Sequence, residues 1–307
     1  MTLPDPLPDL SPLAPEDWQA ALDRLGEEHG YFEPAGPGHA SLFLDLERVL
    51  LVTFESMEEA RRRPGARPRG LDLAARRGWS LLAFLSEGDT WFRDPAVWGT
   101  FDRLSDDGFF EDFERVLFFG IGPGGYAAAA LSVAAPGARV LAIRPQATLT
   151  PRIAGWDRRF MAARRLDFTS RYGYAPDMTD AAEKVDLVVD PRVAADAIHA
   201  ALFTRDNVTL HRATGAGGRL DLVLDQMELT ETLIEVAMEG RLGPAAFGRL
   251  WRARRGNPAY LRGLVKRLEA RGRTGLALRV CRHGLGTAEP AGFARRIEEL
   301  AATAAAQ

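Results

Sequence analysis

The residues with the clearest chemical potential form a glycine-rich turn, GIGPGGY, at positions 120–126. An apolar run at 115–119 precedes the turn, and the small residues at 126–135 that follow it are typical of a helix. Between a strand and a helix, such a turn can hold a phosphate on backbone N–H groups or present a nucleophile above a sheet. It can also serve packing alone, because glycine allows a helix to approach a strand closely.

The first interpretation is a dinucleotide site. Gly120, Gly122 and Gly125 satisfy the pattern G-x-G-x-x-G, in the expected strand and helix context. An NAD site places an acid after the next strand to bind the ribose, whereas this chain has Arg144, which could meet a 2′-phosphate instead. Several predicted strands also precede the motif, although this fingerprint usually opens its domain. We therefore predict no cofactor.

The second interpretation is the sharp turn G-x-S-x-G, in which small residues flank a nucleophilic serine. Gly120 and Gly124 take the flanking positions, and Gly122 takes the position of the nucleophile. Gly122 has no side chain to attack a carbonyl, and Pro123 lacks the N–H that would stabilise an oxyanion. Because loss of one such donor costs about 10²- to 10³-fold in rate, we predict no covalent catalysis at this turn.

This segment resembles the G-x-S-x-G-G-Y turn of α/β-hydrolases, including bacterial polysaccharide-associated hydrolases, and the resemblance extends loosely over residues 42–239. It implies an acid at Asp190, just after a strand, and a base in the glycine-rich loop TGAGGR at 214–219. The histidine of that loop is replaced by Gly218 or Arg219. The degenerate triad positions are Gly122, Asp190 and Gly218.

Other readings of the candidate residues stay open. Asp190 could act only as the N-cap of the following helix. His211 lies within a predicted strand, where a packed histidine is commoner than a base. His199 follows Asp196 by three residues and could imitate a metal ligand, but no further ligand has a recognised spacing, so we predict no metal. The candidate ligand-pocket residues are Gly120, Gly122, Pro123, Gly124, Gly125, Tyr126, Arg144, Asp190 and His211.

The elements that would position these residues alternate between strands and helices. A strand at 115–119, a helix at 126–135 and a strand at 139–143 form a βαβ unit, which implies a parallel sheet. The other predicted strands are 40–46 and 48–54, as a pair, then 79–85, 185–189 and 208–211; the other predicted helices are 15–28, 95–104, 194–203 and a run from 220 onward. Together with the resemblance, this order predicts an α/β-hydrolase-like three-layer sandwich with a mostly parallel central sheet and a C-terminal helical appendage.

We predict that residues 1–240 form this domain and that residues 241–307 form a basic helical appendage. Residues 1–15 read as an extended arm, and the irregular, arginine-rich stretch 145–178 as a cap-like excursion. The net charge is −3, yet residues 249–273 hold nine Arg or Lys and a single acid. Such a stretch can bind anionic partners, although a solvated helix face is the commoner explanation.

Along nearly its whole length, the chain also resembles a bacterial family whose members are often labelled phosphoadenosine phosphosulfate reductase. The resemblance is closest in GYFEP (30–34), WFRDPAVW (91–98), RPQATL (144–149) and DFTSRYGYAPDM (167–178). Such a reductase needs an S-G-G-x-D-S phosphate loop and a reactive C-terminal cysteine. The chain lacks that loop. Its one cysteine, Cys281, is either inert on a helix or has its thiol pKa lowered by Arg279, Arg282 and His283.

Composition narrows the location and the partners. One cysteine excludes an intramolecular disulfide, no apolar run is long enough to span a membrane, and the N-terminus lacks the features of a secretory signal. We predict a cytoplasmic protein that binds an unknown small molecule or protein, without membrane or nucleic acid. The leading hypothesis is a non-catalytic accessory module on a hydrolase fold. The alternatives are the sulfonucleotide reductase of the label and a hydrolase with a non-standard nucleophile.

Overall fold

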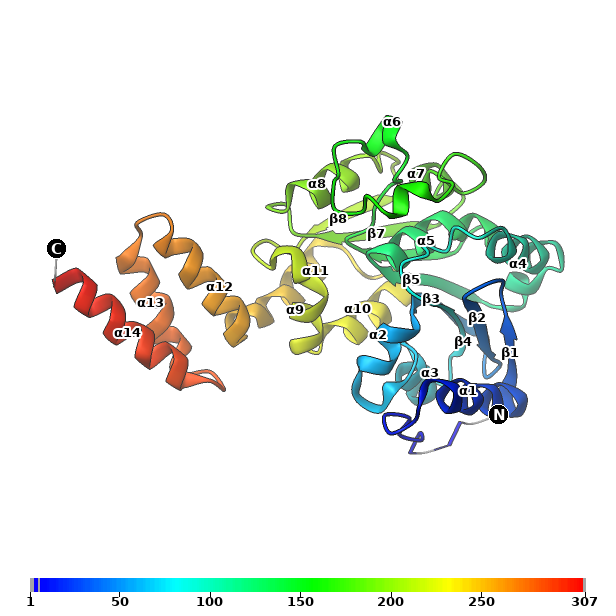
Figure 1. Cartoon of the computed structure of the whole chain (residues 1–307), viewed down its shortest axis with the longest axis horizontal. Coiled ribbons are helices and arrows are strands. Elements are labelled where there is room, and N and C mark those ends of the chain that lie inside the picture. Colours follow the sequence, from blue (N-terminus) through cyan, green and yellow to red (C-terminus); the bar gives the residue numbers. More distant parts are fainter. Residues whose placement is uncertain (1–2, 5, 306–307) are drawn as a thin grey trace.

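One sheet organises the part of the chain that the computed structural model describes, which is residues 3–4 and 6–305, with side chains through residue 301 (Figure 1). Its strands are β1 (Gly30–Pro34), β2 (His39–Leu44), β3 (Val49–Ser56), β4 (Ser80–Ser86), β5 (Arg115–Ile121), β6 (Arg139–Ile143), β7 (Lys184–Val189) and β8 (Val208–Arg212). The order across the sheet is β1-β2-β4-β3-β5-β6-β7-β8. Strand β2 is antiparallel to β1 and β4, and the other pairs are parallel. The carboxyl ends of β3 to β8 therefore share one edge.

Helices cover both faces of this sheet, and further helices follow it at the C-terminal end. The helices of the described part are α1 (Pro15–His29), α2 (Met57–Arg62), α3 (Leu71–Arg77), α4 (Pro95–Asp106), α5 (Pro123–Leu131), α6 (Pro151–Ala154), α7 (Ala175–Met178), α8 (Ala194–Ala201), α9 (Leu220–Gln226), α10 (Leu229–Met238), α11 (Pro244–Leu250), α12 (Pro258–Glu269), α13 (Thr274–Gly284) and α14 (Pro290–Ala305). Helices α4, α5 and α8 share one core cluster, and α1, α3, α9, α10 and α11 share the other. The expected three-layer α/β fold is confirmed. None of the described helices has both the length and the hydropathy to cross a membrane.

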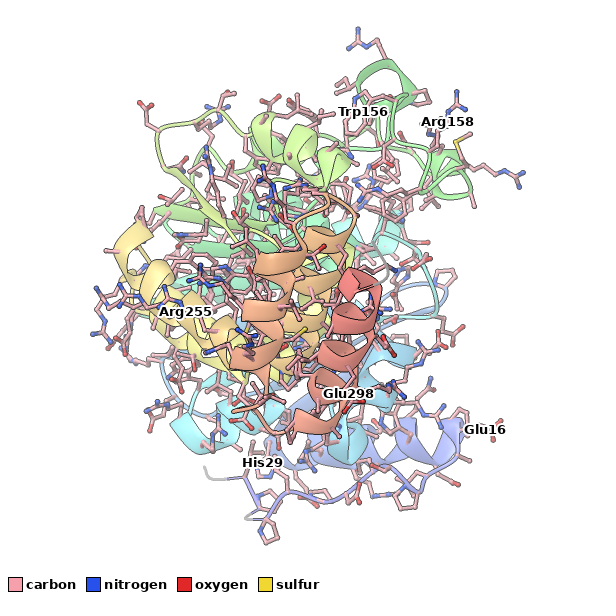
Figure 2. All side chains as sticks on the ribbon, turned by 90° about the vertical axis from the view of Figure 1, so that its left-hand side faces the viewer. Glu16, His29, Trp156, Arg158, Arg255 and Glu298 are labelled. Atoms are coloured by element: carbon pink, nitrogen blue, oxygen red, sulfur yellow. The ribbon has the colours of Figure 1, made fainter. Side chains whose placement is uncertain are left out.

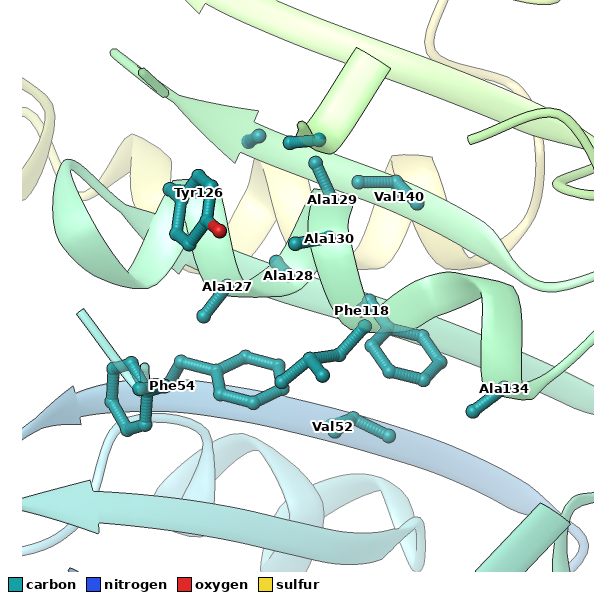
Figure 3. Packing of buried hydrophobic residues seen from close by; sticks show 14 of the residues in the cluster. Val52, Phe54, Phe118, Tyr126, Ala127, Ala128, Ala129, Ala130, Ala134 and Val140 are labelled. Carbon is teal, nitrogen blue, oxygen red and sulfur yellow. The ribbon is translucent and has the colours of Figure 1, made fainter. Parts of the chain in front are cut away.

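Burial on both faces of the sheet explains why the inner strands have continuously apolar sequences and do not alternate between apolar and polar residues. Every residue of β4 is buried, as are all residues of β3 except the last, because helices lie on both faces. On one face, the alanines at 127–130 bring α5 close to Phe118 and Val140 (Figure 3). Small side chains are needed there because a bulkier helix could not lie so near the strands.

Two details of the predicted sheet are wrong. The segments 40–46 and 48–54 correspond to β2 and β3, but they do not pair with each other, because β4 lies between them. Strand β1 was not predicted at all. It is an edge strand that ends in Pro34, and its residues are exposed or half-buried, so it lacks the apolar signal of the inner strands.

The stretch 145–178 contains short helices and turns, and hydrogen bonds tie it to the body of the domain. The buried Arg93 donates from Nε to the Asp167 carbonyl at 2.6 Å and from Nη1 to the Arg171 carbonyl at 2.8 Å. The Tyr126 hydroxyl of α5 donates to the Tyr172 carbonyl at 2.8 Å. Trp156 lies in the outer part of this stretch (Figure 2). That the stretch 145–178 acts as a cap remains a prediction.

The C-terminal helices divide between two cores. Phe247 of α11 and Trp251 belong to the core cluster of the sheet. Helices α12, α13 and α14 instead pack around a small cluster of their own, which includes Leu261, Cys281 and Phe293. Figure 1 shows these three helices extending away from the sheet. The predicted boundary between the two domains at residue 240 stays a prediction. Helix α11 lies beyond that boundary and nevertheless packs on β8.

Candidate functional site

The glycine turn lies between β5 and α5, at the carboxyl edge of the sheet. Gly122 has φ +56° and ψ −118°, a backbone conformation that favours glycine. Its N–H donates to the Ile143 carbonyl at the end of β6, at 2.8 Å, and its carbonyl accepts from the Tyr126 N–H at 2.9 Å. These two bonds fix the turn between the neighbouring strand and the first turn of the helix.

The glycines on either side of Gly122 are required by close backbone contacts. An ideal Cβ at Gly120 would lie 2.0 Å from the Gly124 carbonyl oxygen, and one at Gly124 would lie 2.1 Å from the Phe54 carbonyl oxygen. No such contact exists at Gly122, where a Cβ would meet nothing within 4 Å. The turn therefore has the packing of a nucleophile turn and open space at the position of the nucleophile, which carries no side chain.

Pro123 stands where a catalytic turn would supply a backbone N–H to stabilise an oxyanion. Pro123 is the first residue of α5, a position that proline favours because its missing N–H is not needed within the helix. The same missing N–H deprives the turn of its usual oxyanion donor. Gly125 and Tyr126 follow within α5 and are buried, with Tyr126 only 1% exposed. Burial raises the pKa of the Tyr126 hydroxyl, so this group stays protonated.

Asp190 directly follows β7, and backbone N–H groups surround its buried carboxylate. Oδ2 accepts from the Gly215 N–H at 3.0 Å and from the Gly217 N–H at 2.7 Å, and Oδ1 accepts from the Arg192 N–H at 3.0 Å. The alternative that Asp190 caps the next helix is wrong, because the N-cap of α8 is Val193. Asp190 instead holds the loop after β8.

Arg144 holds the same loop from the end of β6. Its Nη1 donates to Asp221 Oδ1 at 2.8 Å and also to the Gly218 carbonyl. The structure thus brings Arg144, Asp190 and Gly218 together, with Gly122 on the neighbouring strand end. Neither Gly218 nor the exposed Arg219 offers a general base, and the Arg219 side chain lies 3.7 Å from Asp221.

His211 does not belong to this site. It lies on β8 with its Nε2 2.7 Å from Asp186 Oδ1 and its ring 5.0 Å from the ring of Phe247. Both its partners belong to β7 and α11, and the His211 side chain is fully buried. His211 is therefore a packed histidine under α11, and including it among the pocket residues was wrong.

A polar cluster near Arg144 was missed by the sequence analysis. Asp157 and Asp196 are both bonded to Arg159, at 2.8 Å and 2.6 Å, and His199 Nε2 lies 3.1 Å from Asp157 Oδ2. Burial lowers the pKa of His199, against the opposing effect of the Asp157 carboxylate. The carboxylate bonded to His199 is thus that of Asp157, whereas Asp196, three residues before His199, is bonded to Arg159. Among the described residues, no group of His, Cys, Asp or Glu could hold a metal ion.

Arg144 Nε, Gln146 Oε1 and Asp196 Oδ2, all at or near this edge, are among the buried polar atoms that have no hydrogen-bond partner within the described residues. Arg144 Nε and Asp196 Oδ2 are 3.8 Å apart, and the Gln146 amide donates to the Arg144 carbonyl at 3.0 Å. Buried polar atoms normally have partners, so these three are unused hydrogen-bonding groups at this edge of the sheet. The only indication of these polar groups in the sequence is the segment RPQ at 144–146, directly after a predicted strand.

Cys281 lies far along the chain from this edge, in the core of the C-terminal helices. It is fully buried on α13. Burial raises the pKa of its thiol, and Glu269 adds to that effect, so of the two alternatives the inert helix cysteine is supported and a lowered pKa is not. A buried thiol with a raised pKa is a poor nucleophile. The reductase label is therefore not supported.

Comparisons with known proteins give structural likeness alone. No family model matches the chain, and no curated protein matches it. Carboxyl esterase 2 from the fungus Tuber melanosporum is 14% identical over 68% of this chain and 85% of its own, with a TM-score of 0.45. An esterase from Pyrobaculum calidifontis is 16% identical over 74% and 91%, with a TM-score of 0.44. The capsule O-acetyltransferase of Neisseria meningitidis serogroup A is 13% identical over 67% and 95%, with a TM-score of 0.44.

Proposed function

We propose that this chain is a non-catalytic protein of the α/β-hydrolase fold that binds a small polar ligand at the carboxyl edge of its sheet. The observation that carries the proposal is Gly122. It occupies the nucleophile position of a fully formed turn, with room for a side chain and none present. Covalent acyl transfer needs a nucleophile, so the turn cannot form an acyl-enzyme.

The surroundings of Gly122 support the same proposal. In a working triad the acid orients a histidine, and its carboxylate binds that ring. Here Asp190 accepts instead from Gly215 and Gly217, so its oxygens hold the loop backbone. Arg144 holds the loop from the other side. The residues that would do chemistry in a hydrolase therefore serve to fix a loop beside the sheet edge.

The chemistry of the ligand follows from the three atoms without partners. Arg144 Nε is a donor, and Asp196 Oδ2 and Gln146 Oε1 are acceptors. All three atoms are buried, and Arg144 Nε lies 3.8 Å from Asp196 Oδ2, so a small polar molecule with hydroxyl or amide donors and an acceptor oxygen would pair with them once the edge opens to admit it. We propose that the protein acts in the cytoplasm as an accessory module through binding of this kind.

Absence of acyl chemistry is directly measurable. We expect no turnover of p-nitrophenyl acetate and no labelling by a serine-directed fluorophosphonate, for the wild type and for Gly122→Ser alike. The variant regains a hydroxyl but still lacks a base in the loop and the N–H that Pro123 cannot supply. An active serine esterase serves as the positive control. Labelling of wild-type protein that maps to the turn 120–126 would overturn the proposal.

Ligand binding can be tested by thermal shift with a panel of small polyols, hydroxy acids and amides. We expect at least one compound to raise the unfolding midpoint of the wild type, because a ligand that binds only the folded state stabilises it. Gln146→Leu removes one of the acceptors without a partner, so the same compound should raise its midpoint less. Equal shifts in both proteins, or no shift with any compound, would contradict the proposed polar site.

A further inference from the structure

A groove of about 590 Å³ lies on the C-terminal helices, between α12, α13 and the 3₁₀ turn Trp251–Arg255. We call it the appendage groove. Its floor is apolar and includes Leu264 and Leu268 of α12 and Leu276 and Val280 of α13. In each helix the two floor residues are four positions apart, so they lie on one face. Leu276 is 45% exposed, although large apolar side chains in a helical core are usually covered.

The rim of the appendage groove is cationic. Arg255, Arg279 and His283 line it, and no acidic residue does. Within the described residues, neither the Arg255 nor the Arg279 side chain has an ion pair, and both are exposed. His283 Nε2 lies 2.8 Å from the Arg255 carbonyl and so joins the two sides of the rim. Arg255 lies at the surface beside these helices in Figure 2.

We infer that the appendage groove binds an acidic amphipathic helix of a partner protein. Such a helix would place leucine-type side chains on the floor and glutamate or aspartate against Arg255 and Arg279. An apolar face laid into a groove is a recurring way to recognise a helix, and complementary charge at the rim speeds encounter and fixes orientation. The charge of the surrounding segment agrees, with nine basic residues against one acid over 249–273.

The side chains on the floor of the appendage groove favour a helix over a nucleic acid as the bound partner. Single-stranded nucleic acids bind on aromatic platforms next to cationic grooves. Tyr260 is the one Phe, Tyr or Trp residue that lines the appendage groove, and its ring already packs against Trp251 and the Arg267 guanidinium, at 6.0 Å and 5.9 Å between centres. The Tyr260 hydroxyl donates to the Thr214 carbonyl at 3.1 Å. The remaining floor is aliphatic, which suits leucine side chains rather than stacked bases.

That hydrogen bond also places the occupant beside the candidate site. Thr214 precedes Gly215, whose N–H donates to Asp190, and a Cβ at Gly215 would come within 3.0 Å of the Tyr260 hydroxyl. A helix in the appendage groove would thus contact a residue that touches the loop after β8. The inference itself does not depend on the proposed function, because it rests on the floor and rim of the groove.

The test uses the full chain and a fluorescent peptide of about 20 residues, with leucines at helical i, i+3/i+4, i+7 spacing and glutamates elsewhere. Fluorescence anisotropy should show binding at least about tenfold tighter than for a scrambled peptide of the same composition, which has no apolar face. The double variant Arg255→Glu, Arg279→Glu should weaken binding by about tenfold or more. Arg271→Glu is the matched control, since Arg271 is exposed but does not line the groove.

Two further readouts separate the outcomes. Circular dichroism of each variant establishes that it is folded, and Leu276→Asp, which puts a charge on the floor, should also weaken binding while the protein stays folded. Equal binding of the scrambled peptide, or equal loss in the Arg271→Glu control, would overturn the inference. So would tighter binding of a single-stranded oligonucleotide with the same dependence on Arg255 and Arg279, which would make the groove a nucleic-acid surface.

Discussion

Gly124→Ala is expected to lower the free energy of unfolding by about 4 kcal/mol or more, or to prevent folding. The new methyl group would lie 2.1 Å from the Phe54 carbonyl oxygen of β3. Neither partner can move aside alone, because Phe54 is held in the ladder between β4 and β5. Urea denaturation followed by circular dichroism would give the free energy of unfolding, provided that the variant folds.

Two other glycines serve as controls for that result. At Gly122 a Cβ meets nothing, so Gly122→Ala should cost only the strain of φ +56° combined with ψ −118°, about 1 to 3 kcal/mol. Gly99 lies within α4, also with open space around its Cβ, and Gly99→Ala should stabilise the protein by about 0.5 to 1 kcal/mol. If Gly124→Ala cost no more than Gly122→Ala, the turn would not be packed against β3 as described.

Asp190→Ala is expected to lower the free energy of unfolding by about 3 kcal/mol. The substitution removes the acceptor for the N–H groups of Arg192, Gly215 and Gly217, and hydrogen bonds to a charged acceptor are the stronger kind. Loss of the carboxylate would also release the loop after β8 from β7. The same denaturation experiment measures the effect, and faster amide exchange at Gly215 and Gly217 would localise it.

Asp206→Ala is the matched control for charge and size, since Asp206 is exposed, and it should change stability by no more than about 0.5 kcal/mol. Asp190→Asn keeps one acceptor oxygen and should lose less than Asp190→Ala. An Asp190→Ala variant as stable as wild type would show that the carboxylate does not hold the loop. In that case Asp190 would not anchor the loop after β8.

Gly124 and Asp190 both test whether the residues around the glycine turn hold the fold together. The tight packing of Gly120 and Gly124 on neighbouring backbone gives the turn a structural use that does not depend on catalysis, because α5 packs on β5 and β6 there. Asp190 has a comparable structural use. Large stability losses at both positions, together with absent acyl transfer, would fit a protein that uses the fold for binding.

The sequence by itself determined the local features. Side-chain identity at Gly122 and Pro123 excludes the usual nucleophile and oxyanion donor whatever the rest of the chain does. The apolar runs located the inner strands to within a few residues, since burial on both faces leaves a strong pattern in the sequence. The element order was enough for the three-layer α/β fold, but β1 escaped because an edge strand has little apolar signal.

Only the tertiary structure decided which residues meet. Arg144 and Asp221 are 77 positions apart, and Asp190 and Gly215 are 25 apart, so their contacts depend on which strand ends are neighbours. The placement of β4 between β2 and β3 shows that chain order does not fix sheet order. Histidines illustrate the limit most clearly, because local sequence cannot tell His211, packed under α11, from a residue at the sheet edge. Which residues become neighbours in space depends on the crossovers between strands and on packing. Side-chain type and the conformational freedom of the backbone are properties of the local sequence.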